Sequence, residues 1–401
     1  MPMDMMTFMS QLNDTLVSEN GPNLAYLLRP TSPHGKDLVK EFKNPVRPMF
    51  RPFEGAMQSP WDEIAIQYAL TCGHIAKRRH GEAFKEHSQL VSLFLRFFTE
   101  NRGWTLPALF SILRDLRDLA FDVIPHHHAK YNGQKSECME DAARTIAKAF
   151  GNCMTDRTSP PDQSRKWGIY YVVKRISLSK NILRALDANT DIPALSLYPR
   201  SHQVTYRYYL GMLSFLNEDY AKSEQELTLA FYNCHINAQN NQQRILTYLI
   251  PLRILKGHLP STELMQRFPI LNELYTPFTA AIRVGDVAGY DRALDQLERQ
   301  LVDLNVWLTL EKARELCVRG LFRRVWVATE KSTRIPVSMF RSSLTVSGIE
   351  ASQDEAECLV ANMIYKGLMR GYISHEKQMV VLAQTNAFPR LADRQQPFSI
   401  I

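Results

Sequence analysis

The sequence lacks several features that mark common protein classes. No segment carries about eighteen consecutive apolar residues, so none is expected to span a bilayer. The first residues, MPMDMMTFMSQLNDTL, contain an early Asp4 and lack the basic start and apolar run of a secretory signal. The six cysteines, at positions 72, 138, 153, 234, 317 and 358, form no CxxC pair. We therefore expect an intracellular protein whose cysteines are small buried side chains, without disulfides or structural zinc.

Known catalytic motifs are missing as well. The chain contains no GxxxxGK[ST], GxGxxG, HExxH or GxSxG pattern. The tract His126–His128 resembles a metal-binding run, but consecutive positions on a regular helix cannot all face one ion. Asp115, Asp118 and Asp122 share one helix face with arginines close by, which favours surface ion pairs. We predict no catalytic residue, no metal and no cofactor. An enzymatic site would need residues that are distant in the sequence and are brought together by folding.

The composition is that of a soluble globular protein with 45% hydrophobic and 22% charged residues. Its 401 residues predict two or three domains. Proline-rich and polar breaks divide the chain into five parts. These are an N-terminal helix with a Pro-rich arm (1–55), helical repeats (56–200), a helical bundle (201–330), a winged helix (331–391) and a tail (392–401).

Most of the chain shows apolar residues at helical three and four spacings, as in WDEIAIQYALTCGHIAKRR. The segment RPTSPHGKDLVKEFKNPVRPMFRPFEG carries five prolines and predicts an extended arm or linker. The segment NCMTDRTSPPDQSRKWG predicts a surface loop. Gly211 and Ala230 stand nineteen apart, as do the small residues of a tetratricopeptide-type hairpin. The stretch around Gly73 and Ala83 matches this pattern less closely. These patterns predict a solenoid of irregular helix pairs.

The pattern changes after Lys331. A short extended segment, Ile335–Val337, leads into a small helix that Gly348 ends, and Ser352 with Glu355 forms a capping box that starts the next helix. We expect this helix to run to Gly371. Two strands, Tyr372–Ser374 and Met379–Ala383, then flank a turn at 375–378. Helix, helix and hairpin together predict a winged helix.

These segments carry a family resemblance. YRYYLGM, LTYLIPLRILKGHLPS and CLVANMIYKGLMRGYISHEKQMVVLAQTNAFP resemble the PCI-domain family. Within it they are similar to the branch of COP9-associated "subunit twelve" proteins and their relatives in the nuclear-pore-associated transcription–export complex. The resemblance is strong over residues 200 to 391 and weaker before them. It implies an all-α fold, in which a TPR-like solenoid precedes a C-terminal winged helix with a small β-hairpin.

The resemblance also implies a function. Members of this branch are non-catalytic nuclear subunits that pair with a larger PCI protein through their winged helices. A small acidic disordered protein, shared with the proteasome lid, clasps the pair. The joined winged helices bind RNA or DNA without sequence specificity, during transcription-coupled mRNA processing or export. The open alternative is a purely protein-binding scaffold of a COP9-signalosome-type ubiquitin-pathway complex.

Cations gather in the last third of the chain. Phosphate binding needs several of them on one surface, and a winged helix can supply them from its second helix, the preceding helix and the wing. Solvated surface positions are the alternative explanation. The candidate phosphate contacts are Arg323, Arg324, Lys331, Arg334, Arg341, Lys366, Arg370 and Lys377.

A second set of residues suggests contacts with protein partners. Tyr365 and Met369 are expected to point away from the apolar stripe of their helix. Met379 and Val381 lie in a strand that we expect at the edge of the hairpin, where another winged helix or the chain's own tail could cover it. Trp326, close to Arg324, is a candidate anchor for an acidic disordered ligand.

Overall fold

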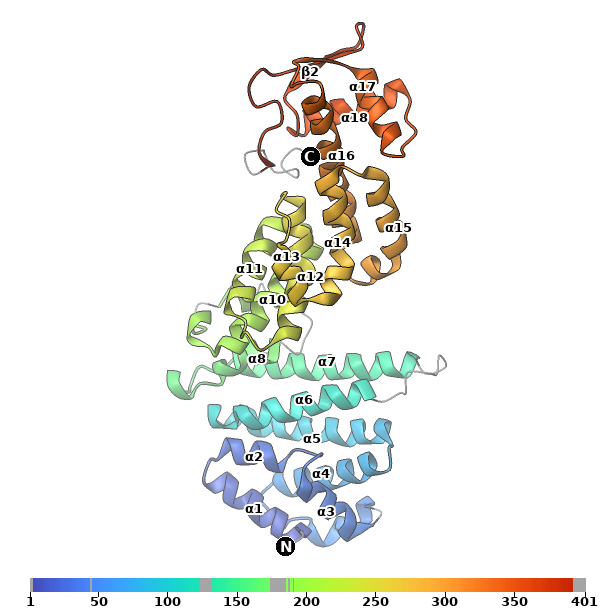
Figure 1. The fold of residues 1–401 in the computed structure, drawn as a ribbon. Coiled ribbons are helices and arrows are strands. Elements are labelled where there is room, and N and C mark those ends of the chain that lie inside the picture. Colours follow the sequence, from blue (N-terminus) through green and yellow to red (C-terminus); the bar gives the residue numbers. More distant parts are fainter. Residues whose placement is uncertain are drawn as a thin grey trace. The chain divides into compact units, whose positions relative to one another are not determined.

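The computed structural model describes residues 3–43, 45–122, 132–173, 185–186, 188–189 and 191–391. The chain divides into two compact units, Met1–Tyr209 and Leu210–Ile401. The His126–His128 tract and the tail at 392–401 lie outside the described residues. Both units are built mainly from helices, as predicted, and three short strands lie near the C-terminal end (Figure 1). Within the described residues, no helix has the length and apolarity needed to cross a membrane.

The first unit is a succession of helices. They are α1 (Met5–Val17), α2 (Gly21–Leu27), α3 (Pro33–Phe42), α4 (Trp61–Ala76), α5 (His80–Glu100), α6 (Leu106–Asp122), α7 (Asn132–Met154), α8 (Ile169–Val173) and the first part of α10 (Arg200–Leu216). Helix α5 packs between α4 and α6, and α6 packs on α7 (Figure 1). The hairpin of α4 and α5 confirms the helix pair predicted around Gly73 and Ala83.

The Pro-rich segment is not an extended arm, which corrects the prediction for residues 29–55. Its prolines start helices instead of preventing them: Pro33 opens α3, where the Ser32 side chain accepts a hydrogen bond from the Gly35 N–H. A 3-10 helix, Arg47–Phe53, follows. Leu38 and Phe50 are buried, so the segment belongs to the core of the first unit.

The predicted surface loop before α8 is confirmed, since residues 157–163 are largely exposed, but it also contains a buried ion pair. Both Asp156 and Arg165 have side chains less than a tenth exposed. One Asp156 oxygen, Oδ2, accepts hydrogen bonds from the Arg165 N–H at 2.8 Å and from the Ser164 hydroxyl at 3.0 Å. Arg165 Nη1 donates to the carbonyls of Phe98 and Thr99, at 2.9 and 2.5 Å. The loop is therefore tied to the end of α5.

The second unit begins with paired helices. They are the end of α10, α11 (Tyr220–Asn233), α12 (Gln239–Leu255), α13 (Thr262–Arg267), α14 (Pro269–Val284), α15 (Val287–Asp303) and α16 (Trp307–Ala328). Gly211 lets α10 approach α11, because a Cβ there would meet Leu227 at 2.7 Å, and the Ser223 hydroxyl donates to the Gly211 carbonyl. This close approach confirms the predicted helical hairpin. Ser261 caps α13, because its side chain accepts a hydrogen bond from the Leu264 N–H.

The winged helix follows α16. It consists of β1 (Arg334–Pro336), α17 (Val337–Val346), α18 (Gln353–Tyr365), β2 (Gly371–Ser374) and β3 (Met379–Leu382). The three strands form one antiparallel sheet in the order β1-β3-β2. Ser352 and Glu355 form the predicted capping box at the start of α18. Ile335, Val337, Phe340, Leu344, Val360 and Val380 make the buried core.

Two details of the predicted winged helix were wrong. Helix α18 ends at Tyr365, not at Gly371, because Gly367 takes a left-handed backbone with φ of 67°. Strand β3 is not an edge strand, because β1 pairs with its second side. The edges of the sheet are β1 and β2.

A C-terminal strap, residues 384–391, holds the winged helix against the helices of the same unit. Arg319 on α16 donates to the carbonyls of Leu368 and Pro389, and Phe388 packs against Trp326 with ring centroids 5.6 Å apart. The Arg370 N–H donates to the Ala387 carbonyl. The NAFP motif thus belongs to a packed connection.

Candidate nucleic-acid interface

The outer face of the small sheet brings together residues from three strands. Side chains alternate along a strand, and the register places Arg334, Val381 and Tyr372 in one row across β1, β3 and β2. Their inward neighbours Ile335 and Val380 are fully buried. Tyr372 is 63% exposed, and Arg334 is exposed as well.

The adjoining row extends this surface. Met379 lies opposite Pro336 and Ser374, and both Met379 and Val381 are half-buried on the outer face. Arg370 precedes β2 by one residue and continues the ladder, since its carbonyl accepts from the Ala383 N–H, and alternation puts it on the side of Tyr372. Lys377 is exposed in the turn. We call Arg334, Arg370, Tyr372, Lys377, Met379 and Val381 the wing face.

The eight candidate cations lie on several elements, and three of them belong to the wing face. Seven of the eight are exposed and form no ion pair with another described residue: Arg323, Arg324, Lys331, Arg334, Arg341, Arg370 and Lys377. Arg324 donates to the Arg283 carbonyl, and Arg341 to the Ala351 carbonyl. Lys366 is half-buried and paired with Glu315 of α16, so its charge is already compensated.

The second helix of the winged helix does not supply cations, contrary to the sequence prediction. Lys366 and Arg370 lie beyond the end of α18 and are not one helical turn apart. Helix α18 itself contains Asp354, Glu355 and Glu357 and no lysine or arginine. A phosphate backbone is therefore better placed on the wing face than along α18.

The predicted partner residues fall into three environments. Tyr365 is 66% exposed, as predicted, whereas Met369 is 1% exposed and cannot contact a partner, because the chain has left the helix before it. Met379 and Val381 lie on the wing face of a central strand, not at a free edge. Trp326 packs against the chain's own Phe388, so the proposed anchor is already engaged.

The two edges of the sheet differ in their free hydrogen-bonding groups. On β1, Pro336 has no N–H, and the Ser332 hydroxyl bonds both the N–H and the carbonyl of Arg334. On β2, the ladder turns the backbone groups of Gly371 and Ile373 away from β3, and no bond to them appears among the described residues. Strand β2 is the open edge. The sequence prediction does not include this difference, although Pro336 indicates a strand edge that lacks a hydrogen-bond donor.

Two further structural observations bear on chemistry. Among the described residues, no group of three or more His, Cys, Asp or Glu side chains is arranged to hold a metal ion. At the turn, Glu357 of α18 accepts a hydrogen bond from His375 Nδ1 at 2.8 Å and another from Gln378 at 3.2 Å. The hydrogen bond and charge of Glu357 raise the pKa of His375.

Comparison with known proteins agrees with this architecture. The PCI domain family model matches residues 294–384, which include α16 and the whole winged helix. A protein named Protein CSN12 homolog from Schizosaccharomyces pombe is 34% identical over 97% of this chain and 98% of its own length. Another of that name from Neurospora crassa is 37% identical over 82% of the chain and 84% of its own length. PCI domain-containing protein 2 of Danio rerio is 28% identical, covering 96% and 97%. The chain therefore belongs to the CSN12-like branch of the PCI-domain family.

Proposed function

We propose that the protein is a non-catalytic scaffold subunit that binds RNA or DNA without sequence specificity, together with a larger PCI protein and a small acidic protein. The complex acts in the nucleus, in transcription-coupled mRNA processing or export. Membership of the family supports the scaffold role, and the cations of the winged helix support the nucleic-acid role.

The wing face is the observation that carries the proposal. Arg334 and Arg370 share a face with the exposed Tyr372, and Lys377 is exposed in the turn that follows β2. None of the three cations forms an ion pair with a described carboxylate. Cations bind phosphates through release of counterions, and an exposed aromatic ring stacks on unpaired bases. This combination suits a single strand and carries no set of side chains for reading base edges.

The open edge of β2 supports the proposed pairing with a second PCI protein. Gly371 and Ile373 offer backbone groups that a strand of another winged helix can satisfy. A partner at this edge would lie beside Tyr372 without covering Arg334 on the far strand. The two winged helices would then form one continuous surface for nucleic acid.

Binding of labelled single-stranded RNA, measured by fluorescence anisotropy at several salt concentrations, tests the proposal. The triple variant Arg334→Gln, Arg370→Gln and Lys377→Gln is expected to weaken binding of all sequences alike. Loss of three phosphate contacts should reduce the slope of log affinity against log salt by about 2, at roughly 0.7 per contact on a single strand. The measurement is made on the chain alone and with any co-purified partner.

A matched control changes the same charge elsewhere in the second unit. Lys222, Arg244 and Arg299 are exposed and belong to none of the ion pairs of the described residues. Replacing these three with glutamine should leave the salt slope within about 0.5 of the unmodified chain. An affinity that does not depend on salt, or equal losses in both triple variants, would remove the wing face from the proposal.

A second function, a purely protein-binding scaffold of a COP9-signalosome-type complex, is favoured by α18. Its three acids and exposed Tyr365 suit a protein surface better than phosphates. On this alternative neither the chain nor its complex binds RNA, and Tyr365→Ala weakens subunit association while Tyr372→Ala does not. Co-purification followed by an RNA gel shift separates the two functions.

A further inference from the structure

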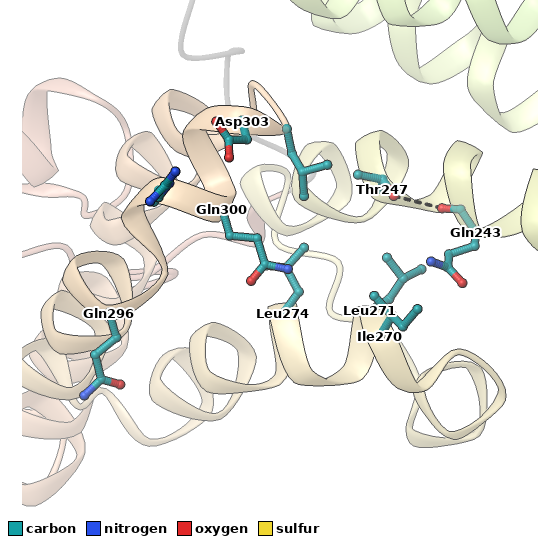
Figure 2. A pocket seen from close by; sticks show the side chains of 10 residues that line it. Gln243, Thr247, Ile270, Leu271, Leu274, Gln296, Gln300 and Asp303 are labelled. Atoms are coloured by element: carbon teal, nitrogen blue, oxygen red, sulfur yellow. Dashed lines mark hydrogen bonds between the residues drawn. The ribbon is translucent and has the colours of Figure 1, made fainter. Parts of the chain in front are cut away.

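A groove of about 470 Å³ lies among three helices of the second unit (Figure 2). Its lining residues fall between positions 243 and 304 and include none of the wing face. Its walls are α12 and α15, and α14 forms its floor. This volume falls within the range of roughly 300 to 1,000 Å³ that is usual for ligand-binding pockets. Its lining includes Gln243 of α12, Ile270 and Leu274 of α14, and Gln300 of α15.

Three carboxamides give the groove its polar character. Gln243 comes from α12, and Gln296 and Gln300 come from α15. No described residue forms a hydrogen bond with any of these three side-chain amides, and Figure 2 shows Gln300 reaching over the floor at Leu274. Each amide can both donate and accept, which matches the alternating N–H and C=O groups of a peptide backbone.

The floor is apolar and held in place. Leu271 and Leu274 are nearly buried, whereas Ile270 is 56% exposed. The fully buried Tyr275 of α14 donates a hydrogen bond from its hydroxyl to the Thr247 carbonyl of α12 at 2.5 Å, which fixes the floor against one wall. An apolar ligand side chain over Ile270 would remove exposed apolar surface from water.

The charge of the groove selects among ligands. Arg299 and Asp303 are its charged lining residues, and their charges cancel. A neutral lining gives no net attraction to a polyanion, so it fits neither nucleic acid nor a strongly acidic segment. The lining of α15 from Gln296 to Asp303 extends about 10 Å, at 1.5 Å per residue, which is enough for roughly three residues of extended chain.

We propose that this groove binds an uncharged, extended peptide segment of a partner protein. The amides of Gln243 and Gln300 bond its backbone from opposite walls, and one apolar side chain of the peptide lies on Ile270 and Leu274. The proposal does not depend on nucleic-acid binding, because it concerns different helices and a different ligand chemistry.

Selection from displayed peptides tests the groove. The purified full-length chain is screened against linear peptides built only from uncharged residues, and in parallel against peptides with acidic residues at alternate positions. Uncharged peptides with an aliphatic or aromatic residue should be enriched, and their affinity is then measured by fluorescence anisotropy. The double variant Gln243→Ala and Gln300→Ala should bind them at least about tenfold more weakly, since each lost hydrogen bond costs about 1 kcal/mol.

Gln239→Ala is the matched control, because Gln239 is an exposed glutamine of α12 outside the groove. It should leave peptide affinity unchanged, and none of these variants should alter the far-ultraviolet circular dichroism. Ile270→Ser tests the apolar contact separately and should also weaken binding. The proposal is overturned if no uncharged peptide is enriched, if only acidic ones are, or if selected peptides bind the double variant as tightly as the control.

Discussion

Leu391 occupies the space that a side chain at position 257 would need. Gly257 has a left-handed backbone with φ of 84°, and a Cβ added there would lie 2.1 Å from Leu391 Cδ1. Gly257 therefore meets two requirements. Its left-handed backbone ends α12, and its missing side chain leaves room for Leu391 of the strap that holds the winged helix. Gly367 has a similar φ of 67°, but a Cβ added there would have no atom within 4 Å.

Gly257→Ala and Gly367→Ala consequently form an informative pair. Gly367→Ala should cost about 1 kcal/mol through its left-handed backbone alone. Gly257→Ala should cost about 2 to 4 kcal/mol, because overpacking against Leu391 adds to the backbone strain. Urea unfolding, followed by hydrogen exchange of peptides from α12 and the strap, measures both. Equal losses in the two variants would mean that the strap does not depend on this contact.

At the scale of elements, the turn between β2 and β3 (the wing) is held against α18 by hydrogen bonds to the carboxylate of Glu357. Glu357 bonds both His375 and Gln378, and Gln353 of the same helix donates to Gln378 at 3.2 Å. The pKa of His375 is raised above its usual 6.5 because Glu357 accepts its hydrogen bond and because of the negative charge of Glu357. The favourable charge pair is therefore fully present below pH 6.5 and is lost as the pH rises through the folded-state pKa.

Glu357→Gln should lower the pKa of His375 toward 6.5, since it removes the charge while keeping an acceptor. Titration of the His375 imidazole by NMR in both proteins measures the change. Glu376→Gln is the control, because Glu376 influences His375 less than Glu357 does and should produce a smaller shift. A His375 pKa that is the same in Glu357→Gln and in the unmodified chain would contradict the role of Glu357 in holding the wing.

At the scale of the whole molecule, one buried ion pair ties the stability of the first unit to pH. Among the ion pairs of the described residues, Asp156–Arg165 is the one whose two side chains are both less than a tenth exposed, and it lies in the first unit. Burial would raise the pKa of Asp156, but hydrogen bonds from Arg165, Ser164 and Ser159 together lower it to about 2, against 3.8 unperturbed. Asp156 therefore stabilises the first unit above pH 3.8, and this stabilisation is lost as the pH falls toward 2.

Protonation of Asp156 should thus reduce the protection of first-unit peptides around residues 152–168. Hydrogen exchange with mass spectrometry, between about pH 4 and pH 2, measures the protection of peptides from each unit. The measured rates are corrected for the pH dependence of intrinsic amide exchange. Asp156→Asn should destabilise the first unit by about 3 kcal/mol at neutral pH, because Arg165 is left buried without its counter-charge, and should remove its extra acid sensitivity. Asp141→Asn, at an exposed ion pair, is the control and should change little. Equal acid sensitivity of the first unit in Asp156→Asn and in the unmodified chain would refute this assignment.

The fold was largely predictable because its strongest signals are local. Helical periodicity, the capping box of Ser352 and Glu355, and the small residue at Gly211 depend on neighbours a few positions away along the chain. The site was less predictable. Helical periodicity places Met369 on an exposed helix face, but the left-handed turn at Gly367 ends the helix before it. The ring of Phe388 that covers Trp326 is distant from it in the sequence.

The sequence by itself determined the class of the fold, the winged helix and the family, since each depends on patterns that are contiguous in the chain. Only the tertiary structure decided that β1 makes β3 a central strand, that Lys366 is neutralised by Glu315, and that Arg334 shares a face with Tyr372. Strand register and ion pairing between distant segments depend on how the whole core packs, and no local pattern encodes them.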